Sequence, residues 1–380
     1  MKHLNPDKLS AAIDAHTDAR LRDNRLGGGA IHILQEGKTV YRRTFGVLHT
    51  GDTAPLADNF IFRTASMTKP VTAAAVLREA DLGRIDLDRP LRDYLPEFAH
   101  VHYAKAENRH LTDLGEIQTP IRVYHLLSHT SGIGCLPAND EQVDNLMHGD
   151  LAAVTAYHSR SFLAFDPYTA QAYSSDAFSV AARLVELSAD MEYGDYLKKY
   201  FFDPLRMPDT GFSLTGEQKT RMISMHRRTA DGLSEDRDLP PDRLFEDLDP
   251  GLARGGFGLA STAGDYVRFA EMLRREGLAL SGERILSADA VRRMRTPHVA
   301  ENVMPGWARW GLGVRVICAP DYPRGLPVGA YGWSGAYGSH FWVDPVNQIT
   351  AVYAKNDGSD GGSESATGIE LELDVSAALE

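Results

Sequence analysis

Residues 62–70 read Phe62-Arg63-Thr64-Ala65-Ser66-Met67-Thr68-Lys69-Pro70. Ser66 and Lys69 are three residues apart, so in a helix they lie on one face, one turn from each other. A helix start is predicted here because Thr64 and Ser66 are capping residue types and a helix tolerates Pro70 in its first turn. Free N–H groups and the positive dipole end at a helix start favour an alkoxide and an oxyanion.

The lysine gives this stretch a second possible role. Desolvation can lower the pKa of a lysine from about 10.4, and the neutral amine can then take the proton of a nearby hydroxyl. Ser66 with Lys69 therefore has the composition of an activated nucleophile. By itself, the same pattern also fits a helix cap followed by a solvated lysine.

Two other segments strengthen the first interpretation. Ala172-Tyr173-Ser174-Ser175 directly precedes a predicted helix, and Tyr173 could act as a second proton-transfer group near Ser66. Gly332-Trp333-Ser334-Gly335-Ala336-Tyr337-Gly338-Ser339 places glycines on a strand, where another backbone or a ligand can approach closely. The N–H of Ala336 could then complete an oxyanion hole with that of Ser66. A core aromatic residue and a packed sheet edge are the structural alternatives for these segments.

The periodicity of apolar residues predicts strands at both ends of the chain and helices between them. Helical patterns cover residues 6–23, 71–82, 123–128, 178–189, 193–202, 265–276 and 369–379. Strand patterns cover residues 30–34, 39–45, 311–317, 331–332, 340–343 and 349–354. We therefore predict an α+β fold in which residues 1–65 and 255–380 form an antiparallel sheet domain. Residues 66–254 form a mainly helical domain with a surface excursion at 215–250, and a site is expected between the two domains.

Composition limits the function. The chain has 380 residues with 40 Lys and Arg against 52 Asp and Glu, a net charge of −12, which argues against nucleic acid as a partner. No apolar run approaches the roughly 18 residues of a membrane span, and no signal peptide precedes the first helix, so a cytoplasmic protein is expected. The two cysteines, Cys135 and Cys318, are expected to be thiols, and their reactivity is left open.

Together, these motifs resemble the serine β-lactamase and penicillin-binding-protein superfamily on its class C side, and most of all its family VIII carboxylesterases. Ser66-x-x-Lys69 matches the first motif, and Tyr173-x-Ser175 matches the Tyr-x-Asn or Tyr-x-Ser element. Trp333-Ser334-Gly335 stands where lactamases carry Lys-Thr-Gly and these esterases carry Trp-x-Gly. Two supporting stretches also fit, Leu126-Leu127-Ser128-His129-Thr130-Ser131-Gly132 and residues 256–262.

The resemblance implies a serine hydrolase in which Ser66 attacks an acyl carbonyl and Lys69 and Tyr173 share the proton transfers, with no metal or cofactor. The oxyanion hole would be the N–H groups of Ser66 and Ala336. Substrate would contact Ser175, Trp333, Ser334 and Gly335. Because Trp333 is apolar where lactamases have a cation, a carboxylesterase acting on small or apolar-acyl esters is favoured.

Several alternatives use the same site. They are a class C-like β-lactamase, a D-amino-acid amidase or peptidase, an acyltransferase, and a non-enzymatic acyl-trapping or scaffold protein. The expected partner is a small ester or amide, and the oligomeric state is not predicted.

Two unrelated mechanisms are disfavoured. Ser334 resembles the nucleophile of an α/β-hydrolase elbow, but that fold needs an acid and then a histidine downstream, and His340 follows after only six residues. A zincin site needs Glu directly after its first histidine, and Leu126 follows His125. The remaining clustered histidines, His100, His102, His110 and His129, are interpreted as structural or surface residues.

Overall fold

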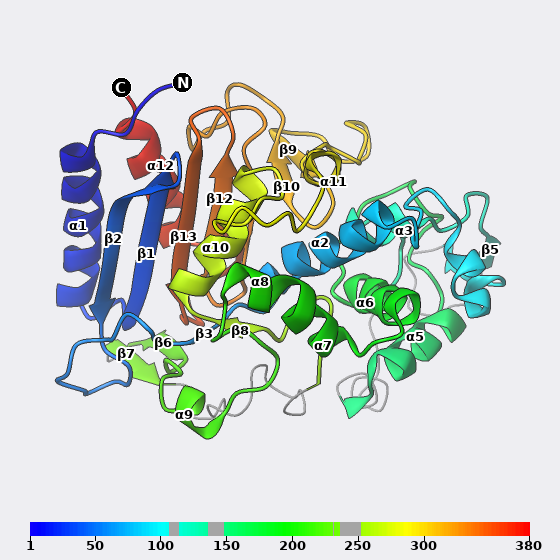
Figure 1. The fold of residues 1–380 in the computed structure, drawn as a ribbon, viewed down its shortest axis with the longest axis horizontal. Coiled ribbons are helices and arrows are strands. Elements are labelled where there is room, and N and C mark those ends of the chain that lie inside the picture. The colour runs from blue at the N-terminus through cyan, green and yellow to red at the C-terminus, as the bar shows by residue number, and fades with distance from the viewer. Residues whose placement is uncertain (106–113, 136–147, 231, 236–251) are drawn as a thin grey trace.

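A seven-stranded antiparallel sheet forms one side of the molecule in the computed structural model, which describes residues 1–105, 114–135, 148–230, 232–235 and 252–380 (Figure 1). From one edge to the other, its strands are β2 (Lys38–Gly46), β1 (Gly28–Gln35), β13 (Ile349–Lys355), β12 (His340–Asp344), β11 (Tyr331–Ser334), β10 (Arg315–Ile317) and β9 (Ala308–Trp310). Strand β1 pairs with β2 on one side and with β13 on the other. The two ends of the chain therefore meet in one sheet, as the sequence predicts.

Helices cover both faces of this sheet, because side chains alternate between the faces along each strand. On one face, α1 (Pro6–Arg22) and α12 (Ala366–Ala377) pack on β1 and β13 through a cluster that includes Leu9, Ile31 and Leu371. On the other face, α10 (Ala263–Arg274) packs through residues such as Phe269 and Val352, which belong to the main core. The central helix α2 (Thr68–Asp81) shares that main core.

The middle of the chain supplies most of the remaining helices, to the right of the sheet in Figure 1. The helical elements are η1 (Ala65–Met67), η2 (Leu91–Asp93), η3 (Pro96–Phe98), α3 (Val123–Leu127), α5 (Leu151–Arg160), α6 (Asp176–Ala189), α7 (Tyr193–Leu197), η4 (Lys198–Phe202), α8 (Asp203–Leu205), α9 (Gly216–Lys219), α11 (Ala288–Met294) and η5 (Gly362–Glu364). Short strand pairs are β3 (Phe62–Arg63) with β8 (Ala260–Ser261), β4 (His102–Ala104) with β5 (Leu114–Glu116), and β6 (His226–Thr229) with β7 (Gly232–Glu235).

Two predicted elements differ in the structure. The single strand predicted over 311–317 is wrong, because a tight turn at 311–314 separates β9 from β10. The Gly311 N–H donates to the Val314 carbonyl at 2.9 Å, and Gly313 has a positive φ of 73° that favours glycine. The helix predicted over 193–202 is α-helical only to Leu197 and continues as the π-helical segment η4.

The excursion predicted over 215–250 contains α9 and the β6–β7 hairpin, while residues 231 and 236–251 lie outside the described part of the chain. The division into domains at residues 65 and 254 stays a prediction.

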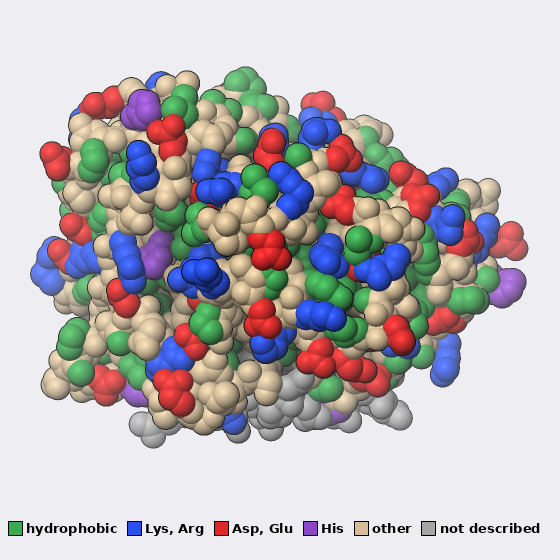
Figure 2. Space-filling view, in the orientation of Figure 1, with side chains coloured by type: hydrophobic (Ala, Val, Ile, Leu, Met, Phe, Trp, Pro, Cys, Tyr) green, Lys and Arg blue, Asp and Glu red, His purple; other side chains and the backbone are tan. Residues whose placement is uncertain are grey.

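The surface is mixed in charge. Acidic and basic side chains are interspersed over the face shown in Figure 2. Within the described ranges, no helix is both long and apolar enough to cross a membrane.

Candidate active site

The backbone around Ser66 is held by a short strand pair and a tight turn. β3 pairs with β8, and the Thr64 N–H donates to the Leu259 carbonyl at 2.9 Å. Ala65 then adopts a positive φ of 45°, a conformation that costs energy for a residue with a Cβ and often marks functional sites. Ser66 lies in the 3-10 turn η1, and α2 begins two residues later at Thr68.

The predicted capping role of Thr64 is wrong. Its side chain makes no capping hydrogen bond, and its hydroxyl donates to the Leu259 carbonyl instead.

Lys69 is fully buried on the first turn of α2, one turn from Ser66. Its Nζ lies 3.3 Å from the Ser66 Oγ, 3.0 Å from the Ser175 Oγ and 2.7 Å from the Gly256 carbonyl oxygen. Gly256 can approach because it has no side chain: a Cβ there would lie 2.4 Å from the Ser175 carbonyl oxygen. Three elements far apart in sequence thus converge on one amine.

Burial sets the protonation of this amine. Desolvation lowers the pKa of Lys69 to about 7, although the charge of Asp176 acts in the opposite direction. A buried lysine with a pKa near neutrality is present in its basic form to a large extent at pH 7.

Tyr173 lies beside Lys69 and Ser66. Lys69 Nζ lies 4.5 Å from the centroid of the Tyr173 ring. Burial raises the pKa of Tyr173 to about 12, although its hydrogen bonds with Ser66 and Trp333 act to lower it. Tyr173 is 42% exposed, so its ring also forms part of the accessible surface of the site.

Trp333 completes this cluster from the sheet. Its Nε1–H donates to the Tyr173 hydroxyl at 3.1 Å, and the two rings are 5.5 Å apart. Trp310 supports it from β9, with a ring-centroid distance of 4.4 Å to Trp333. An uncharged donor and an apolar indole surface therefore face the Tyr173 hydroxyl.

The loop after β11 lies against the turn that carries Ser66. A Cβ on Gly335 would lie 2.6 Å from the Thr64 carbonyl oxygen, so only glycine permits this approach. Among the hydrogen bonds between described residues, none uses the N–H of Ser66 or Ala336 as its donor. Both N–H groups are thus available to an acceptor.

Comparison with known proteins identifies the family of the chain. A model of the Beta-lactamase family matches residues 13–373. The chain belongs to the Beta-lactamase family. It is an enzyme of the serine-hydrolase type found in that family.

Relatives and solved structures cover nearly the whole chain. Esterase EstB of Burkholderia gladioli is 29% identical over 390 residues, covering 95% of this chain and 93% of that protein. Protein Rv1367c of Mycobacterium tuberculosis is 28% identical over 378 residues, covering 92% and 90%. The structure of EstCE1, a hydrolase with promiscuous acyltransferase activity, has a TM-score of 0.82 at 21% identity, covering 98% of this chain and 99% of that one.

Within this Beta-lactamase-family fold, the structure brings together Ser66, Lys69, Tyr173, Ser175 and Trp333, and places Gly335 and Ala336 beside them. Ser334 is the exception among the predicted residues. It is 4% exposed, and its hydroxyl pairs with His340 on the α12 side of the sheet. The Ser334 hydroxyl is therefore already engaged with His340, and a contact between Ser334 and substrate stays a prediction.

Two contributors to the site were not predicted from the sequence. The Gly256 carbonyl lies in one of the stretches that carry the family resemblance, but nothing in the sequence connects it with Lys69. His129 was interpreted as structural or surface, and the structure makes it a buried neighbour of the site. Its Nδ1 accepts the Ser174 N–H at 3.0 Å, and its ring lies 4.5 Å from that of Tyr173.

Neither metal binding nor a reactive Cys135 receives structural support. Among the described residues, no group of three or more His, Cys, Asp and Glu could hold a metal ion, and His110 lies outside those residues. Burial raises the pKa of the Cys135 thiol to about 11, so it stays protonated near neutrality.

Proposed function

We propose that this protein is a carboxylesterase that forms a covalent acyl-enzyme on Ser66 and prefers esters with small or apolar acyl groups. One observation carries the proposal: the Ser66 hydroxyl is hydrogen-bonded to a buried amine of lowered pKa, and it interacts with the hydroxyl of a tyrosine of raised pKa. Such a pair can remove a proton from the nucleophile and return one to the leaving group.

The contacts of Lys69 support its role as the group that receives the proton. A neutral amine has two N–H donors and one lone pair. The Gly256 carbonyl can only accept, and Ser175 can take the second N–H, so the lone pair is left for the Ser66 O–H. We therefore assign the role of base to Lys69, while Tyr173 keeps its proton near neutral pH.

The reaction then proceeds in two halves. Ser66 Oγ bonds to the acyl carbon as its proton moves to Lys69, and the N–H groups of Ser66 and Ala336 stabilise the oxyanion. The ester C–O bond breaks as the Tyr173 hydroxyl protonates the departing alkoxide, and Lys69 returns its proton to Tyr173. Water then attacks the acyl carbon and gives its proton to the pair of Tyr173 and Lys69. Ser66 regains a proton from Lys69 as the acyl group leaves, so Lys69 ends neutral.

Trp333 is the reason for favouring esters over β-lactams. A cation at its position would attract the carboxylate of a β-lactam, whereas the indole presents an apolar surface and one neutral donor. We expect p-nitrophenyl esters of short acids to be cleaved much faster than a chromogenic cephalosporin. Faster turnover of the cephalosporin would reject the esterase assignment.

A charge-restoring variant tests the role of Trp333. Trp333→Lys is expected to raise the ratio of cephalosporin to ester kcat/KM by about tenfold, the value of one charge-assisted hydrogen bond. Trp333→Phe is the matched control, because it loses the Nε1 donor without gaining a charge. An unchanged ratio in Trp333→Lys would show that this position does not select the substrate.

The role of Tyr173 is tested by varying the leaving group. Tyr173→Phe is expected to lower kcat about 100-fold for alkyl esters, whose alkoxide needs a proton, and much less for p-nitrophenyl esters, whose phenolate leaves without one. Equal losses for both ester types would contradict a role for Tyr173 as the acid.

The predicted partner is a small ester or amide, of which this proposal favours the ester, and the cytoplasmic location stays a prediction. If a primary alcohol added to the assay captures the acyl group, the same acyl-enzyme also supports acyl transfer.

A further inference from the structure

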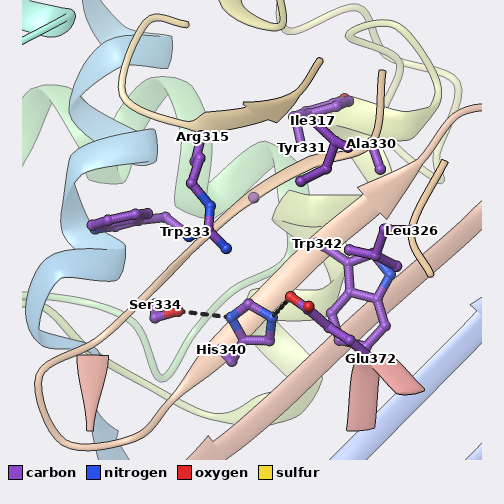
Figure 3. Close-up of a pocket in the computed structure, with 11 residues that line it drawn as sticks. Arg315, Ile317, Leu326, Ala330, Tyr331, Trp333, Ser334, His340, Trp342 and Glu372 are labelled. Carbon is purple, nitrogen blue, oxygen red and sulfur yellow. Dashed lines mark hydrogen bonds and ion pairs between the residues drawn. The ribbon is translucent and has the colours of Figure 1, made fainter. Parts of the chain in front are cut away.

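Three buried polar side chains form a hydrogen-bonded series behind β11, the strand that carries Trp333 (Figure 3). Ser334 Oγ lies 2.8 Å from His340 Nδ1, and His340 Nε2 lies 2.9 Å from Glu372 Oε1. The three residues come from β11, β12 and α12, and they are 4%, 6% and 1% exposed. Their composition is that of a Ser–His–acid triad, although they play no part in the mechanism above.

The proton positions in this series follow from the charge of Glu372. Burial would raise the pKa of Glu372, but its hydrogen bond with His340 and the positive charges of Arg324 and Arg315 hold it below its usual value. An ionised carboxylate only accepts hydrogen bonds, so His340 Nε2–H donates to it. In the neutral imidazole, Nδ1 then carries a lone pair, which accepts the Ser334 O–H.

The series is not arranged for nucleophilic attack. Neighbouring residues on a strand point to opposite faces, so Ser334 faces α12 while Trp333 faces Tyr173. The cavity beside Ser334 and His340 has a volume of only about 10 Å³, room for about one water molecule. An acyl substrate does not fit there.

The hydrogen-bonded side chains of Ser334, His340 and Glu372 instead hold the loop that carries Ala336. Ser334 and His340 form the last residue pair of the β11–β12 ladder, directly before the loop of residues 335–339. Their side-chain bond therefore ties the two strands at the point where the loop begins and ends, and the Gly335 N–H to Ser339 carbonyl bond of 2.7 Å continues the ladder. Glu372 fixes the orientation of the histidine ring from α12.

We propose that His340, held by Glu372, is a positioning residue that fixes the 335–339 loop through Ser334 and so places the Ala336 N–H for oxyanion stabilisation at Ser66. The inference rests on the proposed function only in assigning the Ala336 N–H to the oxyanion. A displacement of about 1 Å at a reacting centre can cost about 100-fold in rate. Loss of the hydrogen bonds between Ser334, His340 and Glu372 should therefore slow the bond-forming step at Ser66 while leaving the binding of the substrate largely unchanged.

The test uses an alkyl fluorophosphonate, which requires no ester turnover. Ser66 Oγ bonds to phosphorus, the P–F bond breaks, fluoride leaves, Lys69 takes the hydroxyl proton, and the P=O oxygen occupies the oxyanion site. Mass spectrometry follows the labelling of Ser66 at several probe concentrations, which separates the maximal labelling rate from the half-saturating concentration. Thermal unfolding of each variant is measured in parallel.

His340→Phe is expected to lower the maximal rate about tenfold to 100-fold with little change in the half-saturating concentration. His340→Gln is expected to recover most of the rate, because its amide can accept from Ser334 and donate to Glu372. His32→Phe is the matched control, since His32 is a 5% exposed histidine of β1 in the same sheet, away from the loop.

The inference would be overturned by a wild-type rate in His340→Phe, by a rate in His340→Gln as low as in His340→Phe, or by an equal loss in His32→Phe. Labelling of Ser334 in a Ser66→Ala background would overturn it as well, by showing Ser334 to be a nucleophile. A wild type that is labelled on Ser66 but cleaves no ester would instead count against the proposed function alone.

Discussion

Ser66→Ala is expected to lower kcat/KM for p-nitrophenyl esters by at least about 10⁴-fold, because removing a nucleophilic serine removes the covalent pathway. The fold should remain intact. Ser66 is only partly buried, and Lys69 keeps its bonds to the Gly256 carbonyl and the Ser175 hydroxyl. Steady-state hydrolysis and thermal unfolding measured on the same preparation check both statements.

Ser179→Ala is the matched control for this variant. Ser179 is a fully buried serine on α6 whose hydroxyl has no hydrogen-bond partner among the described residues, so its loss should leave activity close to that of the wild type. Substantial esterase activity in Ser66→Ala would show that another group performs the chemistry.

Lys69→Met is expected to lower kcat by about 10³-fold to 10⁴-fold, at the upper end of the range for general base catalysis, because no other amine contacts the Ser66 hydroxyl in the described structure. Methionine fills a similar volume without burying a charge. The Gly256 carbonyl loses its partner, so some loss of thermal stability should accompany the loss of rate.

The pH dependence follows from the same amine. Since burial lowers the pKa of Lys69 to about 7, wild-type kcat/KM should rise about tenfold per pH unit up to about pH 7 and then level off. Only the neutral amine accepts a proton, so activity is lost on the acidic side. Because the pKa of Tyr173 is about 12, Tyr173 stays protonated across this range.

The fall in kcat/KM below about pH 7 distinguishes base catalysis by Lys69 from a purely structural role. In Lys69→Met, this pH dependence should disappear together with most of the rate. A residual activity that keeps the wild-type limb near pH 7 would assign this ionisation to a different group.

The parts of the site that could be predicted were those in which the residues lie only a few positions apart in the sequence. Ser66 and Lys69 lie one helical turn apart whatever the rest of the chain does, so their contact follows from the sequence. Tyr173 and Trp333 are 160 residues apart, and their meeting followed only from the family resemblance. The meeting of β1 with β13 was indicated by the strand patterns at both ends of the chain.

What could not be predicted depends on long-range packing. The Gly256 carbonyl reaches Lys69 only because the backbone approaches closely at a glycine, and no spacing rule indicates which glycine does so. The sequence disfavoured Ser334 as an α/β-hydrolase nucleophile because His340 follows after only six residues, with no room for an acid between them. The hydrogen bond between these two side chains was not predicted. Glu372 reaches His340 from α12 instead, on the far side of the sheet.

Local backbone details were missed for a related reason. The run over 311–317 has strand-like composition, but the glycines at its start permit a turn that separates β9 from β10. Ala65 has a positive φ although alanine, unlike glycine, rarely adopts one, so its residue type does not predict this conformation. The surrounding β3–β8 pair and the core impose that conformation directly before Ser66.

The central claim is that Ser66 carries an acyl group during turnover. The most direct measurement is mass spectrometry of the protein after acid quenching during steady-state cleavage of a p-nitrophenyl ester, followed by mapping of the modified peptide. We predict one added acyl group, located on Ser66 and absent from Ser66→Ala. Turnover at full rate with an unmodified Ser66, or with the acyl group on another residue, would contradict the account.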